Sequence, residues 1–257
     1  MSPLLTVRNL AVDYRTGKDI LPAVSDVSFD LKSGETLGFV GESGCGKSTI
    51  ALALMGLLPK EEGHMKDGEI VFDGKKLSTD KQWRKIRGRG IAMIFQDPFS
   101  SLNPVMTVRE QLLEVASKKK AAELLKDVQL FETERILGSY PHQLSGGQRQ
   151  RVMIAMALAR GPKILIADEP TTALDVTVQK EIIELLKKLQ KELKMAMIFV
   201  THNIGLVKDV ADELAVMYQG QIVEIGETEK ILSRPKHDYT KALLTAVPTI
   251  RAAKGKS

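Results

Sequence analysis

GESGCGKST, at residues 41–49, is the segment that decides the fold of this chain. An apolar run from Thr36 to Val40 precedes it, and an apolar stretch with a helical pattern follows it through Leu58, before Pro59. A strand, a glycine-rich loop and a helix in series gather backbone N–H groups and the positive end of a helix around one point, which is an arrangement that binds phosphate. A glycine-rich turn without a ligand is the alternative. The spacing favours a phosphate-binding loop made of Gly41, Glu42, Ser43, Gly44, Cys45, Gly46, Lys47, Ser48 and Thr49. Within it, Lys47 would bring a full positive charge to the outer phosphates, and the Ser48 hydroxyl would be a ligand of Mg²⁺.

A second apolar strand ends in two adjacent acids. It reads ILIADEP at residues 164–170, so Asp168 and Glu169 follow directly on a run of buried character. Because ligands of parallel sheets bind at the carboxyl ends of the strands, both acids should lie beside the phosphate-binding loop. We expect Asp168 to hold Mg²⁺ and Glu169 to orient and polarise an attacking water. A solvated acidic turn is the alternative.

Two further polar side chains follow strands of the same expected sheet. His202 comes after Ala196–Thr201 and should lie near the terminal phosphate, while Gln96 comes after Ile91–Phe95 and should reach the metal or the water. The alternatives are a structural histidine and a surface glutamine. The predicted catalytic set is Glu169, His202, Gln96 and Lys47, and the predicted metal ligands are Ser48, Gln96 and Asp168.

LSGGQ, at residues 144–148, precedes another expected helix. Ser145 suits the N-cap position, and the glycines expose backbone N–H groups at the start of the helix. Taken alone, the segment predicts only a helix cap. Beside a phosphate-binding loop, it predicts a second anion site.

The remaining patterns predict an α/β fold: a P-loop NTPase core with a mostly parallel sheet, a small N-terminal antiparallel part and an inserted helical part. Residues 1–30 alternate as two strands around a polar turn, and an amphipathic helix with its apolar face at Val178 to Leu193 joins two buried strands. We assign residues 1–34 to the antiparallel part, 35–95 and 161–235 to the core, 96–160 to the helical part, 236–250 to a C-terminal segment and 251–257 to a disordered tail.

The composition fits one large domain with a packed core: 257 residues, 43% of them hydrophobic and 27% charged. A single cysteine, Cys45, excludes an internal disulfide and a cysteine-based metal site within the chain. No apolar run is long enough to span a membrane, and the N-terminus lacks the layout of a secretory signal. We therefore expect a cytosolic chain with peripheral membrane contact only. The net charge of +5 is no clear sign of nucleic-acid binding, because acidic residues are spread through the chain.

Six motifs follow one another in the order known from one family: GESGCGKST, FQDP, LSGGQ, LIADEP, ALD and VTH. With them the chain resembles the ATP-binding subunits of ABC transporters from Leu4 to Pro248, and LSGGQ is the most specific motif. The resemblance implies ATP and Mg²⁺ as cofactors, Tyr14 stacked on adenine, and Gln96 linking the nucleotide site to a membrane subunit. It also implies contacts across a two-subunit interface, with Ser145, Gly146, Gly147, Gln148 and Asp175 facing ATP bound to the opposite subunit.

Within that family the chain resembles importers of oligopeptides, dipeptides and nickel, most specifically through HDYTKALLTAVP. Such systems pair two ATPase subunits, and the chain resembles the first of them, so the resemblance implies a second ATPase subunit that differs from this one. It also implies two membrane permeases, an external solute-binding protein, no nucleic acid, and a place on the cytoplasmic face of the membrane. A soluble ABC-type ATPase acting on nucleic acid or ribosomes is the alternative, although no coiled-coil insertion or second ATPase unit is seen. A degenerate regulatory partner is disfavoured because no residue of the chemical set is missing.

Three departures from the family pattern stand out. Asn203 follows His202 where aspartate is usual, and the helical segment between Arg109 and Leu130 is shorter than expected. Some relatives carry a cysteine cluster after YTKALL, and we predict none here.

Overall fold

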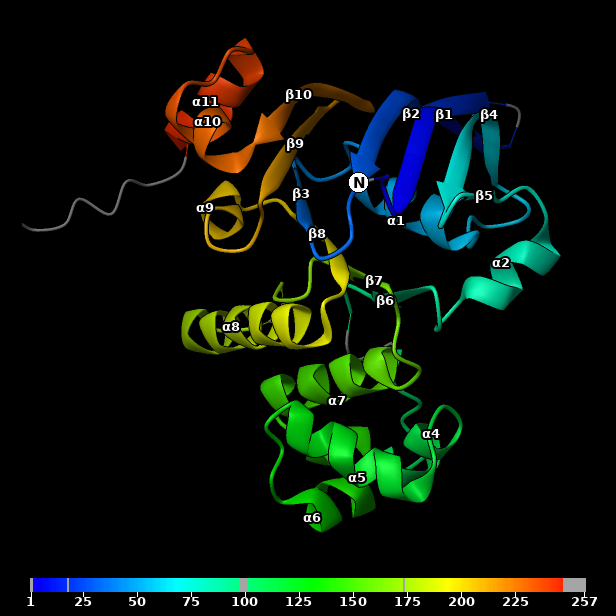
Figure 1. Ribbon diagram of the computed structural model, residues 1–257, viewed down its shortest axis with the longest axis vertical. Coiled ribbons are helices and arrows are strands. Elements are labelled where there is room, and N and C mark those ends of the chain that lie inside the picture. The colour runs from blue at the N-terminus through cyan, green and yellow to red at the C-terminus, as the bar shows by residue number, and fades with distance from the viewer. Residues whose placement is uncertain (1, 18, 98–100, 173, 247–257) are drawn as a thin grey trace, which may run out of the picture.

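The computed structural model describes residues 2–17, 19–97, 101–172 and 174–246, which form two sheets flanked by helices (Figure 1). The predicted disordered tail, residues 251–257, lies outside the described residues. Among the helices of the described part, none has the length and apolar character needed to cross a membrane.

The smaller sheet is antiparallel, with strand order β2-β1-β4-β5. Its strands are β1 (Leu5–Thr16), β2 (Asp19–Leu31), β4 (Gly63–Phe72) and β5 (Lys75–Lys76). The sequence alternation in β1 and β2 is confirmed, since Leu5 and Val7 are buried while Thr6 between them is only half-buried. The sheet extends beyond the predicted residues 1–34, because β4 pairs along β1 from Leu5 to Tyr14. That pairing joins segments far apart in the chain, which local alternation does not reveal.

The larger sheet is mostly parallel, as predicted, with strand order β10-β9-β3-β8-β7-β6. Its strands are β3 (Thr36–Val40), β6 (Ile91–Ile94), β7 (Ile164–Asp168), β8 (Ala196–Thr201), β9 (Glu213–Tyr218) and β10 (Gln221–Glu227). Only β10 runs antiparallel to its neighbour, as the second strand of a hairpin with β9. The loop after β3, the two acids at the end of β7 and the histidine after β8 therefore lie at one edge of the sheet.

Both faces of the sheet are covered at β3, β6, β7 and β8, which explains why these strands are buried along their whole length, whereas the edge strand β10 is partly exposed. In β7, Ile164 and Ile166 join a core with the antiparallel sheet and α1 (Lys47–Met55), while Leu165 and Ala167 face the opposite core. That second core contains α8 (Val176–Leu193) and the helical lobe. Within the first core, Phe29 of β2 and Phe39 of β3 meet edge to face, with ring centroids 5.2 Å apart, and join the two sheets.

Helix α1 is shorter than predicted. It ends at Met55, because Gly56 takes a left-handed conformation with φ 59° and its N–H returns to the carbonyl of Ala53. The predicted end at Leu58 before Pro59 was therefore wrong, since the glycine terminates the helix first. A short helix, α2 (Asp80–Ile86), lies beside the antiparallel sheet (Figure 1).

The helical lobe projects from one side of the core (Figure 1). It contains α4 (Val108–Leu113), α5 (Lys118–Asp127), α6 (Thr133–Gly138), the 3₁₀ turn η1 (Pro141–Gln143) and α7 (Gly146–Leu158). Helix α6 was not expected from the sequence. At the opposite end of the larger sheet lie α9 (Ile204–Val207), α10 (Thr228–Ser233) and α11 (Asp238–Ala246).

Candidate functional site

The glycine-rich loop joins β3 to α1 and is held against two strands. At Gly46, with φ 105°, an added Cβ would lie 2.5 Å from the carbonyl oxygen of Ala23 in β2. At Gly41, an added Cβ would lie 2.3 Å from the carbonyl oxygen of Met217 in β9. Both positions require glycine, because backbone approaches backbone too closely for any side chain. The loop is thus built as a close-fitting backbone cradle.

The start of α1 carries a buried cation and no side-chain cap. Lys47 is the first residue of the helix and is only 4% exposed, and its Nζ donates to the carbonyl oxygens of Gly41 and Glu42 at 2.7 Å each. A cation at the N-terminal end is unfavourable for the helix dipole, so a bound anion stabilises this end strongly. The uncapped N–H groups and the lysine fit phosphate. Cys45 is buried in the loop, with its Sγ 3.6 Å from Lys47 Nζ.

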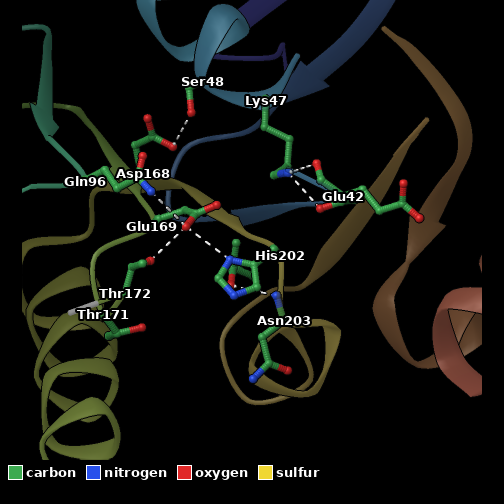
Figure 2. A network of polar contacts seen from close by, with 12 residues as sticks. Glu42, Lys47, Ser48, Gln96, Asp168, Glu169, Thr171, Thr172, His202 and Asn203 are labelled. Carbon is green, nitrogen blue, oxygen red and sulfur yellow. Dashed lines mark hydrogen bonds and ion pairs between the residues drawn. The ribbon is translucent and has the colours of Figure 1, made fainter. Parts of the chain in front are cut away.

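Asp168 and Ser48 meet at the end of β7. The Ser48 hydroxyl donates to Asp168 Oδ1 at 3.1 Å (Figure 2). Burial raises the pKa of Asp168, and the negative charge of Glu169 adds to the rise, while Ser48 and Lys47 oppose it. Two hard oxygen donors beside a phosphate cradle fit Mg²⁺, whose remaining ligands are usually water and phosphate oxygens. The described residues contain no group of three or more histidine, cysteine or acidic side chains that could hold a metal ion by themselves.

Glu169 is the centre of a separate polar network (Figure 2). Its Oε2 accepts from Gln96 Nε2 at 3.2 Å and from Thr172 Oγ1 at 2.8 Å, and lies 3.1 Å from His202 Nδ1. The residue is 8% exposed, and its backbone has φ 45°, a region that costs free energy for a residue with a side chain. Its carboxylate meets Gln96, which follows β6, and His202, which follows β8, whereas Asp168 meets Ser48. The two acids therefore have different protein partners, and their predicted roles toward metal and water stay predictions.

The network also places residues that sequence reasoning missed or placed differently. Thr172 was not predicted, although a hydroxyl three residues after the glutamate was a usable signal. Gln96 was predicted to reach metal or water, and in the structure its amide donates to Glu169. The Asn203 side chain accepts from Gly205 N at 2.9 Å and caps α9, a role that aspartate fills equally well. His202 itself is half exposed, beside Glu169.

The second glycine segment lies at a different surface, where α7 begins against α8. Ser145 Oγ accepts from Gln148 N at 3.2 Å, and Gln148 Oε1 accepts from Ser145 N at 3.1 Å, which confirms Ser145 as the N-cap. An added Cβ at Gly147 would lie 2.8 Å from Val178 Cγ1. The neighbouring Asp175 caps α8 by accepting from Thr177 N and Val178 N.

Tyr14 lies in β1, paired with Leu21 of β2 and Gly63 of β4. It is half-buried on the core of the antiparallel sheet, and β2 touches the phosphate-binding loop at Ala23. The structure thus brings the loop, Asp168, Glu169, Gln96 and His202 to one edge. It sets a second group apart at the start of α7 and α8: Ser145, Gly146, Gly147, Gln148 and Asp175.

Comparison with protein families gives two matches. Residues 24–172 match the ABC transporter family, and residues 223–257 match the family described as oligopeptide/dipeptide transporter, C-terminal region.

Two curated relatives illustrate the similarity. The oligopeptide transport ATP-binding protein OppD of Bacillus subtilis is 49% identical over 97% of this chain and 73% of its own length. The glutathione import ATP-binding protein GsiA of Escherichia coli is 49% identical over 98% of this chain and 43% of its own length.

Solved structures agree with this assignment. A dimeric, post-hydrolysis form of the ATP-binding cassette MJ0796 with ADP and Pi has a TM-score of 0.74 at 33% identity, over 87% of this chain and 98% of that one. The cbiO1 protein of Clostridium perfringens, part of the ABC transporter complex cbiONQ, has a TM-score of 0.74 at 30% identity, over 91% of this chain and 92% of that one. The phosphate cradle, the two divergent acids and these matches lead to one conclusion: the chain belongs to the ATP-binding, ATP-hydrolysing subunits of ABC transporters.

Proposed function

We propose that this ATPase drives the import of peptides and uses Mg²⁺-bound ATP at the edge of its parallel sheet. The observation that carries the proposed chemistry is the Glu169 carboxylate, held by Gln96, Thr172 and His202 while Asp168 faces Ser48. This separation of the two acids supports the proposal that one serves the water and the other the metal.

Each residue has a distinct part in this proposal. Glu169 orients and polarises the attacking water, and His202 and Gln96 hold the carboxylate in place from two neighbouring strands. Lys47 and the loop N–H groups bind the phosphates, and Tyr14 stacks on adenine. Ser48 and Asp168 hold Mg²⁺, with Gln96 as the further predicted ligand. When bound, the ion neutralises charge on the phosphate oxygens.

The second surface is proposed to complete the site of another subunit. Ser145, Gly146, Gly147 and Gln148 would contact ATP held by the partner, with Asp175 across the interface, so two nucleotides close two sites. The dimeric form of the MJ0796 cassette supports this arrangement. We expect a different ATPase subunit as partner, hence a heterodimer rather than a homodimer, on the basis of family resemblance.

The transported solute is proposed to be a peptide. The match at residues 223–257 and the oligopeptide relative OppD support peptides over nickel or metal chelates, which related importers also carry. The chain would act at the cytoplasmic face of the membrane, bound to two permeases that receive solute from an external binding protein. No role on nucleic acid is proposed.

The test is reconstitution of the chain with its companion ATPase and permeases in liposomes containing the solute-binding protein. ATP hydrolysis that rises with added oligopeptide, and requires Mg²⁺, is the expected result. Stimulation by nickel instead would replace the solute assignment. Stimulation of the free chain by nucleic acid, with none by peptide or nickel, would replace transport itself.

A further inference from the structure

The C-terminal arm, residues 236–246 including α11, is docked on the core beside the phosphate-binding loop. Glu224 of β10 holds its start, because Oε1 accepts from Lys236 N at 2.9 Å and Oε2 accepts from His237 N at 3.1 Å. Burial acts to raise the pKa of Glu224, but these hydrogen bonds outweigh it and leave the pKa below its ordinary value. Farther along the arm, Leu243 and Leu244 pack on an apolar cluster that contains residues of β3 and β9. The arm is thus fixed at both ends.

Tyr239 connects this arm to the loop. Its ring lies on Tyr218 at the end of β9, with centroids 4.3 Å apart and planes 32° apart. Its hydroxyl oxygen accepts a hydrogen bond from the backbone N–H of Glu42 at 3.1 Å. The contact joins residues 197 positions apart in the sequence. Glu42 is the second residue of the loop, so the C-terminal arm reaches the nucleotide site itself.

The peptide group that donates to Tyr239 also accepts a hydrogen bond from Lys47. The N–H of Glu42 and the carbonyl of Gly41 belong to one planar peptide, and that carbonyl accepts from Lys47 Nζ at 2.7 Å. Tyr239 and Lys47 therefore hold opposite edges of the same plane. Rotation of this peptide away from Tyr239 would carry the carbonyl away from Lys47. Hydrogen bonds in such a chain also polarise one another and are strengthened together.

The neighbouring hairpin supports the same loop. Gly220, in the turn between β9 and β10, donates its N–H to the carbonyl of Cys45 at 3.1 Å. The carbonyl of Gly220 accepts from the N–H of Ser25 in β2, so the turn is bound to both the loop and β2. Tyr218 therefore belongs to a hairpin that is itself bound to the loop. Because the Tyr239 ring packs on Tyr218, the Tyr239 hydroxyl has a defined position.

We propose that Tyr239 is a positioning residue for ATP binding, which holds the Gly41–Glu42 peptide so that Lys47 is presented to the phosphates. The docked C-terminal arm is then part of the nucleotide site. This inference rests on the proposed role of Lys47 in binding phosphate.

The test compares two single-hydroxyl deletions in the full chain. Tyr239→Phe keeps the ring stack and removes the acceptor for Glu42 N–H. It is expected to weaken binding of a fluorescent ATP analogue, and to raise KM for ATP in the assembled transporter, by about threefold to tenfold, with kcat within about twofold of wild type. Tyr218→Phe is the matched control, because its hydroxyl contacts the exposed Gln219 side chain 3.3 Å away. The control is expected to keep both nucleotide affinity and KM.

Thermal unfolding of both variants without nucleotide is expected to match wild type within about 2 °C, since the lost bond is near solvent. Unchanged nucleotide affinity in Tyr239→Phe overturns the inference, as does an equal loss in Tyr218→Phe. Failure of the proposed ATP site is a separate result, because it would appear as unchanged affinity in Lys47→Ala with an active wild-type chain.

Discussion

The two glycine-containing helix starts of this molecule, before α1 and before α7, differ in how their backbone donors are used. Helix α1 begins after Gly46, in a left-handed conformation and without a side-chain cap. Helix α7 begins after Ser145, in an extended conformation, with a reciprocal cap between Ser145 and Gln148. The first start leaves its donors for an outside anion, whereas the second satisfies two groups within the chain.

This difference suggests an order of events. The α1 start, with its buried Lys47, is ready to bind phosphate in a single chain. In the proposed pair, the α7 start would meet a nucleotide held by the partner, and the Ser145 hydroxyl could donate to it while still accepting from Gln148 N. We therefore expect substitutions near α1 to act on ATP binding and chemistry in each subunit, and substitutions near α7 to act only in the assembled pair.

The largest effect is expected at Glu169, the acid proposed to orient the attacking water. Glu169→Gln keeps the shape of the side chain but removes the charge that polarises water, so turnover should fall by about 10²- to 10⁴-fold with ATP binding retained. Steady-state phosphate release and nucleotide binding measure the two quantities. Glu184→Gln, an exposed change on α8, is the matched control and should leave turnover within about twofold. Turnover of Glu169→Gln near that of wild type would remove Glu169 from its role.

The next effect tests the phosphate side of the same site. Lys47→Ala removes the only charge that the first turn of α1 offers, and ATP affinity should fall by about 10- to 100-fold in the single chain. Equilibrium binding of a fluorescent ATP analogue is the measurement. Lys163→Ala, which breaks a surface pair with Asp73, is the control and should leave affinity unchanged. Equal ATP affinities in Lys47→Ala and Lys163→Ala would contradict the assignment of the α1 start as the phosphate-binding end.

Substitution at the α7 start should separate assembly from binding. Ser145→Ala and Ser117→Ala each remove an N-cap serine, from α7 and α5, and each should cost about 0.5–2 kcal/mol of stability. Only Ser145→Ala should also lower turnover of the assembled transporter, by about tenfold, while ATP binding to the single chain stays unchanged. Urea unfolding and ATP hydrolysis measure the two effects. Similar turnover in the two variants would leave Ser145 as a cap and nothing more.

The smallest effect is expected at the Arg8–Asp30 ion pair, away from both helix starts. It serves as a reference for a substitution that changes stability but not ATP binding. The hydrogen bonds from Arg8, at 2.8 and 2.7 Å, hold the pKa of Asp30 below its ordinary 3.8, although burial acts to raise it. A lowered pKa in the folded state stabilises the chain above the unfolded pKa, and this contribution is lost as pH falls through the folded value. Asp30→Asn should thus destabilise by less than about 1 kcal/mol at pH 7, because the pair is partly exposed. The difference from wild type in urea unfolding should shrink below about pH 4, with ATP binding unaffected at pH 7. A difference that grows as pH falls would reverse the assigned sign.

Local patterns in the sequence determined the elements that carry the chemistry. The strand before Gly41, the buried strand before Asp168 and the serine cap of α7 each depend on residues within one or two turns of chain, so spacing and alternation predict them. The end of α1 differs from the prediction because Gly56 supplies the left-handed stop before the chain reaches Pro59.

Only the tertiary structure decided which distant groups meet. The pairing of β4 with β1, the convergence of Gln96, Thr172 and His202 on one oxygen of Glu169, and the hydroxyl of Tyr239 on Glu42 N–H each join separate segments. Such contacts depend on strand order and on backbone turns such as the φ of 45° at Glu169, which side-chain type alone does not specify. The sequence by itself therefore determined that a phosphate loop and two acids share one sheet edge, because strand direction follows from the alternation of strands and helices. The division of the acids between two sets of partners, and the attachment of the C-terminal arm to the loop, were decided by packing across the whole chain.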